Sequence, residues 1–185
     1  MLSREEFENK YEKIFNDNKC LQSIFDFGKN SHDDKSKVVY IHNIMKNLFD
    51  QMFKNKDLYI ILFIWNTNFG TEQDLLDLGF DYNLMDKKYD NITIKDHQLT
   101  DNPENTIINL LYIEKYNYDK IKFLIQATAT WELDLNPTAN VNAYFINFSD
   151  NNDILINFHD DRGLEILTTS QDLHKQIDDL FHSLE

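Results

Sequence analysis

The chain has 185 residues, of which 42% are hydrophobic and 14% aromatic, and its formal net charge is -14 at pH 7. This length and composition allow one sizeable core, so we expect a single globular domain over residues 1–185 and exclude a disordered or repetitive chain. The negative charge argues against a nucleic-acid partner, because binding would bring like charges together instead of releasing counterions.

Three sequence features favour a cytoplasmic protein without a membrane partner. The single cysteine, Cys20, cannot form an internal disulfide. The N-terminus, MLSREEFENKYEK, lacks the apolar core of a secretory signal. The longest apolar run, from Leu58 to Trp65, is far shorter than the roughly 20 residues that span a bilayer.

The negative charge is concentrated towards the C-terminus. Between Glu132 and Glu185 the sequence holds eleven acidic residues against Arg162 and Lys175. Such a surface can steer a basic protein towards it, so we expect a basic protein partner. The alternative is that an acidic isoelectric point is ordinary for a bacterial cytosolic protein.

In the first third of the chain, apolar residues recur at helical spacing in two segments. Residues 3–17 begin with Ser3 and Glu6, which have the spacing of a capping box, and predict an amphipathic helix. A second helix is predicted over residues 34–54. The run 57–65 lacks helical period and is rich in aromatic and β-branched residues, so it predicts a strand that is central in a sheet.

The middle of the chain alternates short helical and extended patterns. Gln73–Leu78 predicts a short helix that ends at Gly79, and Asn91–Lys95 predicts a short strand. Thr106–Glu114 predicts an apolar strand, and Tyr118–Ala129 has helical spacing.

The last third gives the clearest pattern. Residues 142–148, 154–159 and 164–168 predict three successive strands, and Ser170 caps a closing helix. Short connections favour an antiparallel meander. The expected fold class is therefore α+β, a single domain with an antiparallel β-sheet, helices packed on it and a C-terminal helix.

The segment YFINFSDNNDILINFHDDRGLEIL resembles a bacterial family known only as domain of unknown function 3885. The resemblance lies in the strand Tyr144–Asn147 and in the four residues Asp160–Gly163, into which a second strand runs. The chain departs from the family pattern at His159, where an aromatic residue is usual, and it stops at Glu185, where the family commonly continues. The resemblance implies the same fold and no established activity.

The most specific group of polar residues is His159, Asp160, Asp161, Arg162 and Gly163. As an enzyme site, the histidine would act as a general base and the arginine would hold an anion. Adjacent strand residues point to opposite faces, however. We favour a structural turn, in which Gly163 accepts a positive φ, an aspartate caps the turn, and Arg162 forms a partly buried ion pair.

Neither a metal site nor a cofactor site is predicted. The histidines at 32, 97 and 159 each lie beside aspartates, without the spacing that places ligands on one side of an ion. With four glycines, the chain has no phosphate-binding loop. Cys20 is interpreted as an inert thiol.

These observations favour a non-enzymatic protein-binding module, for example an immunity-type neutraliser of a basic toxin. The alternative is a small-molecule or metal-dependent enzyme that uses His159, Asp160, Asp161 and Arg162. A third hypothesis, a sensor of a small ligand, predicts a deep pocket lined by Trp65 or Trp131.

Overall fold

The computed structural model describes residues 1–15, 20–27, 33–65, 72–94, 106–131, 141–149, 152–159 and 162–184. The α-helices in these ranges are α1 (Arg4–Phe15), α2 (Asp34–Met52), α3 (Glu72–Asp77), α4 (Tyr118–Trp131) and α5 (Gln171–Leu184). A short 3-10 helix is η2 (Tyr82–Leu84). The strands are β1 (Leu21–Asp26), β2 (Leu58–Trp65), β3 (Lys87–Tyr89), β4 (Thr106–Ile113), β5 (Val141–Asn147), β6 (Ile154–Phe158) and β7 (Gly163–Thr168).

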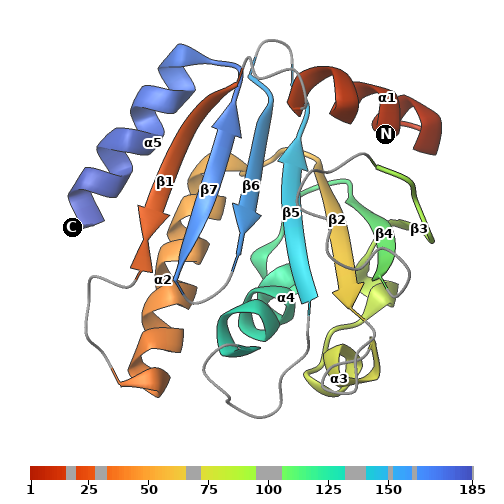
Figure 1. Ribbon diagram of the computed structural model, residues 1–185, viewed down its shortest axis with the longest axis horizontal. Helices are drawn as coiled ribbons and strands as arrows, with labels where there is room; N and C mark the ends of the chain where they lie inside the picture. Colours follow the sequence, from red (N-terminus) through yellow and green to blue (C-terminus); the bar gives the residue numbers. More distant parts are fainter. Residues whose placement is uncertain are drawn as a thin grey trace.

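The described strands form one antiparallel sheet in the order β1-β7-β6-β5-β2-β4-β3 (Figure 1). The last three strands of the chain pair in sequence, β5 with β6 and β6 with β7, which confirms the predicted meander. Strands β1 and β3 lie at the two edges of this sheet. The α+β class with a C-terminal helix is confirmed.

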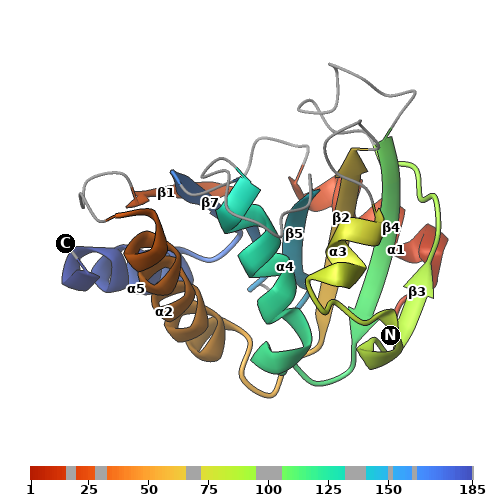
Figure 2. The same cartoon turned by 90° about the horizontal axis from the view of Figure 1, so that it is seen from below.

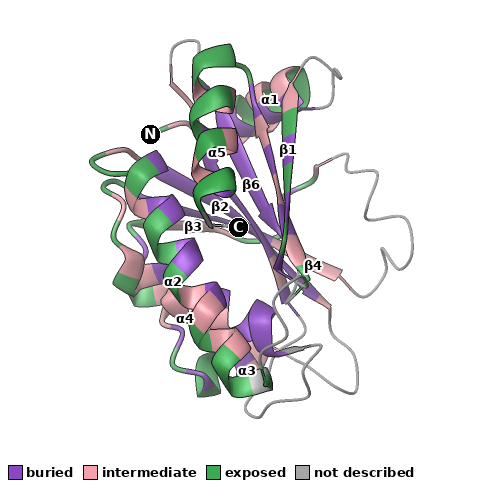
Figure 3. Ribbon diagram, turned by 90° about the vertical axis from the view of Figure 1, so that its left-hand side faces the viewer, coloured by how far each residue is buried: buried purple, intermediate pink, exposed green. Residues whose placement is uncertain are grey.

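Four helices cover one face of the sheet, and the main core lies between them and the strands (Figures 1 and 2). The predicted apolar stripe of α2 is in this core, with Ile41, Met45 and Phe49 fully buried. In β2, which is buried on both faces as predicted, alternate residues such as Ile60 and Leu62 point towards these helices. Figure 3 shows the buried strands between the helices on one side and α1 on the other.

Helix α1 packs on the opposite face and forms a second core. Phe7, Tyr11 and Phe15 are buried there against strand residues that include Tyr59 and Tyr144. The 3.6-residue period of α1 places these three rings on one side of the helix. The centre of the sheet is therefore buried on both faces, which explains the continuous apolar run of β2.

Side chains cap the starts of several described helices, among them α1, α2 and α5. At α1, Ser3 and Glu6 form the predicted capping box, since the Ser3 amide donates to Glu6 Oε2 at 2.7 Å and the Glu6 amide donates to Ser3 Oγ at 3.3 Å. Asp33 accepts a hydrogen bond from the Ser36 amide at the start of α2. Ser170 accepts one from the Leu173 amide at the start of α5. These bonds satisfy amides that a helix leaves unpaired at its first turn.

The strand predicted over Asn91–Lys95 is wrong for residues 91–94, and Lys95 lies outside the described residues. The Asn91 backbone has a φ of 50°, which breaks an extended path. The backbone amides of this segment bond irregularly, that of Asn91 to the Asn109 side chain and that of Thr93 to Glu8. No continuous ladder can therefore form here.

The remaining predicted elements are confirmed, with ends that shift by one or two residues where the structure describes them. Gly79, with a φ of +95°, follows α3 as predicted. Residues 16 and 17, predicted as the end of the first helix, lie outside the described residues. None of the described helices combines the length and the apolar character that a bilayer-spanning helix requires.

Candidate functional site

The predicted residues His159 and Gly163 close the connection between β6 and β7. The His159 amide donates to the Gly163 carbonyl oxygen at 3.3 Å, so these two residues form the last hydrogen-bonded pair of the two strands. Asp160 and Asp161 lie outside the described residues. The structure therefore brings His159, Arg162 and Gly163 to one turn and leaves the two aspartates undescribed.

The predicted role of Gly163 is wrong in its mechanism. Among the described glycines only Gly79 has a positive φ. Gly163 is instead the first residue of β7, opposite Asp26 of β1. A Cβ atom at position 163 would lie 2.6 Å from the Phe25 carbonyl oxygen. Glycine is required here because the two strand backbones approach too closely for any side chain.

His159 and Arg162 are both exposed. His159 Nε2 lies 3.9 Å from Glu165 Oε2, and the backbone carbonyl of Arg162 accepts a hydrogen bond from the Phe27 amide at 2.7 Å. The ion pair expected at Arg162 stays a prediction, and the residue itself is exposed rather than partly buried. The backbone bonds at this turn join β1, β6 and β7.

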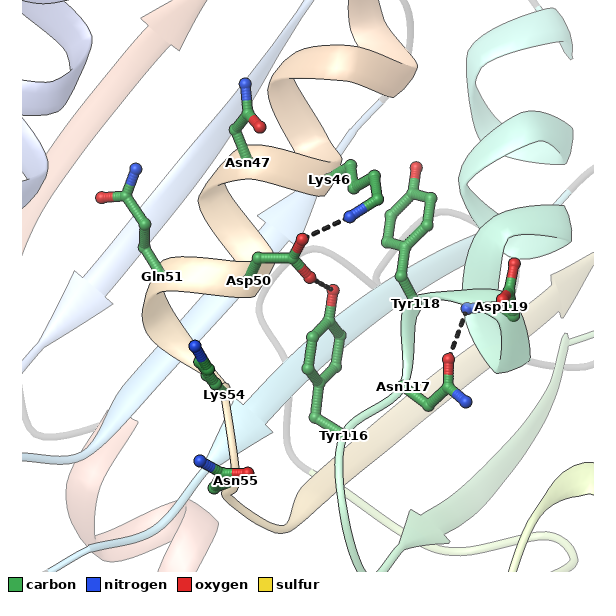
Figure 4. Close-up of a pocket in the computed structure, with 10 residues that line it drawn as sticks. All are labelled: Lys46, Asn47, Asp50, Gln51, Lys54, Asn55, Tyr116, Asn117, Tyr118 and Asp119. Atoms are coloured by element: carbon green, nitrogen blue, oxygen red, sulfur yellow. Dashed lines mark hydrogen bonds and ion pairs between the residues drawn. The ribbon is translucent and has the colours of Figure 1, made fainter.

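A different group of polar residues lines a hollow of about 580 Å³ between α2 and the start of α4 (Figure 4). Asp50 is at its centre. Lys46 and Tyr116 both bond to the Asp50 carboxylate, Tyr116 through its hydroxyl at 2.9 Å. The lining residues are Lys46, Asn47, Asp50, Gln51, Lys54, Asn55, Tyr116, Asn117, Tyr118 and Asp119.

The charges of this hollow hold Asp50 in its ionised form. Burial alone raises the pKa of Asp50, but the hydrogen bonds from Lys46 and Tyr116 and the positive charges of Lys46 and Lys54 outweigh it, so the pKa is lowered. Burial and the hydrogen bond to Asp50 raise the pKa of Tyr116 well above its usual range. Tyr116 therefore stays a neutral hydrogen-bond donor.

The second tyrosine of the hollow, Tyr118, is held by hydrogen bonds to His42 of α2. The Tyr118 hydroxyl lies 2.9 Å from His42 Nδ1 and donates to the His42 carbonyl oxygen at 3.3 Å. Burial and the positive charge of Lys122 lower the pKa of His42. This pre-organised, mainly polar wall suits hydrogen bonding to a small ligand. Trp65 does not line it, and the side chain of Trp131 lies outside what the structure describes.

Ser23, His174 and Asp178 bring serine, histidine and aspartate side chains together between β1 and α5. Ser23 Oγ lies 2.9 Å from His174 Nδ1 and donates to Asp178 Oδ1 at 2.6 Å. A serine nucleophile must give its proton to the histidine. The single hydroxyl proton of Ser23 is held by the carboxylate instead, and Ser23 is only 6% exposed. The group therefore fastens α5 to β1.

Within the described ranges, no three histidine, cysteine or acidic side chains are grouped to hold a metal ion. Cys20 is half-buried, and its thiol donates to the Ile14 carbonyl oxygen at 3.2 Å. Burial and the negative charge of Asp153 raise the pKa of the Cys20 thiol. A raised pKa lowers the thiolate fraction and so disfavours nucleophilic chemistry.

The segment 72–94, which contains α3, η2 and β3, combines negative charge with exposed apolar side chains. It holds six acidic residues and two lysines. Leu76 is 38% exposed and Leu84 is 41% exposed, whereas Leu75 and Phe80 of the same segment are buried in the main core. We call this segment the acidic surface. Part of its negative charge is offset, because Lys88 pairs with Glu72 and Asp90 and Lys120 pairs with Asp86.

A family model described as Domain of unknown function (DUF3885) matches residues 8–184. The chain belongs to this family. The match extends the resemblance from the last two strands to nearly the whole chain, so most of α1, the sheet and α5 are part of the DUF3885 domain. Comparisons with curated proteins and with solved structures gave no match. The DUF3885 description assigns no activity, and function has to be argued from the surfaces above.

Sequence reasoning missed the hollow and the Ser23 group. Lys46, Asp50 and Lys54 do recur every four residues on the polar side of α2, which is a detectable signal. Their partners Tyr116 and Tyr118 are more than sixty residues away, so sequence spacing could not place them together. In the sequence, the acidic surface shows only as a high content of acidic residues between positions 72 and 94.

Proposed function

We propose that the protein is a non-enzymatic binding module for a basic protein, for example an immunity-type neutraliser of a basic toxin. The observation that supports this proposal best is the acidic surface at residues 72–94. Its exposed Leu76 and Leu84 are two of five large hydrophobic residues exposed within the described ranges. Acidic residues flank both leucines in the sequence.

The two kinds of side chain have separate roles in the proposed contact. Acidic groups such as Asp77 and Asp90 attract a basic partner over about a Debye length, which is about 10 Å at 0.1 M salt. The leucines are desolvated on contact, and the free energy of binding comes chiefly from such buried apolar groups. Binding should therefore weaken with salt and fail when the leucines become polar.

This proposal moves the expected contact away from the last third of the chain. Of the acidic residues there, Asp153 is buried and accepts a hydrogen bond from the Ser149 amide. Asp178 is held by Ser23. Six others, including Asp160 and Asp161, lie outside the described residues, which leaves the half-buried Glu165 and the exposed Asp172 and Asp179. The carboxylates of the acidic surface carry the proposal instead.

The experiment is capture of partners from native lysate with three forms of the chain. The wild type and Val39→Asn, whose side chain is 60% exposed on α2, should retain one basic protein at about 0.1 M salt and release it at about 1 M salt. The double variant Leu76→Asn, Leu84→Asn should lose it at both. Capture that responds neither to salt nor to the leucine change would contradict the proposal.

A second candidate function, small-ligand binding, is favoured by the hollow between α2 and α4. Asp50, Tyr116 and Tyr118 are fixed there before any ligand arrives. Titration calorimetry with pools of small polar metabolites would test it, and Tyr116→Phe should weaken any binding found. Heats that are the same for wild type and Tyr116→Phe would exclude this hollow as the site.

The enzyme alternative that uses His159, Asp160, Asp161 and Arg162 stays a prediction. It is tested by Arg162→Ala, since an exposed arginine can be removed without loss of the fold. Lost activity or ligand binding in a folded variant would support it. The cytoplasmic location also stays a prediction, and fractionation of the native cells would test it.

A further inference from the structure

The hollow between α2 and the start of α4 carries charged groups that balance one another (Figure 4). Its charged lining residues among those described are Lys46, Lys54, Asp50 and Asp119. Lys46 bonds to the Asp50 carboxylate, and Lys122 Nζ lies 3.1 Å from Asp119 Oδ1. An ionic ligand of either sign would meet a like charge in this hollow, which is unfavourable. The charge pattern therefore favours a neutral ligand.

Hydrogen-bond acceptors and donors are neighbours in the hollow. Asp50 accepts one bond at each carboxylate oxygen, from Tyr116 at Oδ1 and from Lys46 at Oδ2. An ionised carboxylate has about four acceptor sites, so each oxygen can accept a further bond. Lys54 forms no ion pair with a described residue, and its charge is close enough to contribute to the lowered pKa of Asp50. A ligand group between Asp50 and Lys54 must donate to one and accept from the other.

Two asparagines add carboxamides to the lining of the hollow. Asn117 Oδ1 accepts a hydrogen bond from the Asp119 amide at 3.0 Å, which leaves the Asn117 Nδ2 group as a donor. Asn55, with a φ of 60°, is exposed just beyond the end of α2, and its side chain bonds to no described residue. A carboxamide both donates and accepts hydrogen bonds. A hydroxyl group does the same with one oxygen, and it rotates to suit its partners.

The Tyr116 ring supplies an apolar surface in the same hollow. The ring packs against the main core, with its centroid 6.2 Å from that of Phe49 and 6.0 Å from that of Phe53. The residue is nevertheless only half-buried, and it lines the hollow. Its hydroxyl bond to Asp50 holds the ring in place before a ligand arrives. Such a ring can cover the C–H groups of a ligand while the polar groups around it bind hydroxyls.

We propose that the hollow binds a neutral, polyhydroxylated small molecule, such as a monosaccharide or a cyclic polyol. This inference rests on the second candidate function above, small-ligand binding, and adds the chemical class of the ligand. One hydroxyl of the ligand donates to Asp50 and accepts a hydrogen bond from Lys54. Further hydroxyls bond to Asn55 and Asn117, and a C–H face of the ligand packs on Tyr116. The volume of about 580 Å³ lies within the roughly 300–1,000 Å³ of small-molecule sites.

The neutrality of the ligand determines how binding responds to salt. The hydroxyls exchange bonds with water for bonds with the protein, so we expect a dissociation constant of about 1 mM. This constant should be the same at about 0.1 M and about 1 M salt, since the ligand carries no charge to be screened. Salt should weaken the binding of an ionic ligand, and also that of a basic protein at the acidic surface. Failure of this inference is therefore distinguishable from failure of the protein-binding proposal.

The first test is saturation-transfer NMR on the wild-type chain with three sets of probes. The neutral probes are glucose, mannose, galactose, N-acetylglucosamine and myo-inositol. The charged probes are gluconate, glycine and spermidine, and the nucleoside probes are adenosine and uridine. We expect transfer to at least one neutral probe, at both salt concentrations. Transfer only to charged or nucleoside probes would overturn the polyol class while keeping the small-ligand function, and transfer to no probe would overturn the proposal.

The second test assigns the binding to the hollow by NMR titration of the neutral probe that binds. Asp50→Asn and Lys54→Met each remove one charged hydrogen-bonding group, so each should weaken binding by about tenfold or more. Tyr116→Leu should weaken it more than Tyr116→Phe, which keeps the ring. The matched control is Asn43→Ala, an exposed position of α2 outside the hollow, which should bind like the wild type. Wild-type affinity in a folded Asp50→Asn or Lys54→Met variant would overturn the proposal.

Discussion

At the residue scale, Gly163 is a position where the addition of one Cβ atom should destabilise the fold. A Cβ there would lie 2.6 Å from the Phe25 carbonyl oxygen, which is backbone and cannot rotate away. Gly163→Ala must push β1 from β7, and overpacking of this kind costs about 1–3 kcal/mol. We expect urea unfolding to show this loss for Gly163→Ala.

The matched control for this prediction is Arg162→Ala, one residue earlier. Its side chain is exposed, so its removal should change the free energy of unfolding by no more than about 0.5 kcal/mol. Equal losses for the two variants would show that the turn, and not the close approach to Phe25, determines stability.

His42 predicts how stability depends on pH. Burial and the positive charge of Lys122 lower its pKa in the folded chain below the usual 6.5. Between the lowered pKa and 6.5 the unfolded chain binds more protons, so stability falls as the pH drops below about 6.5. The slope from one such group is at most about 1.4 kcal/mol per pH unit.

This slope is measured by urea unfolding between about pH 7.5 and pH 5.5, the range in which histidines titrate. The variant His42→Gln carries no titrating group at this position and should show a flatter dependence than the wild type. An unchanged slope in His42→Gln would contradict the role given to His42 and Lys122.

At the element scale, the attachment of α5 to β1 depends on both apolar and polar contacts. The rings of Phe25 and Phe181 lie 4.7 Å apart, and Ser23 bonds to His174 and Asp178. Ser23→Ala removes two hydrogen bonds, of which the one to a carboxylate is the stronger, so we expect a loss of about 1–3 kcal/mol.

Hydrogen exchange would locate this loss. Amides of α5 should exchange faster in Ser23→Ala than in the wild type, while amides of β2 in the centre of the sheet should change less. A uniform change across α5 and β2 would show that α5 is not a separately opening unit.

The elements predicted from the sequence were those whose apolar pattern matches their burial. Helix α2 shows helical period over 19 residues, and β2 is apolar throughout. Strand β1 was missed because its pattern is inverted, with Ser23 buried and Ile24 exposed. Strand β3 was missed because three residues, KKY, are too few to show a period. Both strands lie at the edges of the sheet. There, the alternation of apolar and polar residues is a weaker indicator of a strand.

At the scale of the whole molecule, the acidic surface lies at one edge of the sheet, because it contains the edge strand β3. Salt should weaken the proposed contact with a basic protein there. Ile24→Lys, in the edge strand β1 at the opposite side of the sheet, should leave capture of the basic partner unchanged.

The sequence identified the family through the last two strands. The partner class that net charge indicates stays a prediction, and the sequence did not predict the surfaces. Gly163 was correctly identified as important, although for the wrong physical reason, since its φ is not positive. The exposure of Leu76, Leu84 and Ile24 depends on which face each element presents. That follows from packing between distant segments, which spacing along the chain does not record.

The most direct test of the central claim is the binding kinetics of the captured basic partner as a function of salt. Charge steering acts on association, and buried apolar contacts act on dissociation. The double variant Asp77→Asn, Asp90→Asn should associate more slowly and show a weaker salt dependence, whereas Leu76→Asn should mainly dissociate faster. Association rates that are independent of salt and of Asp77 and Asp90 would contradict the account.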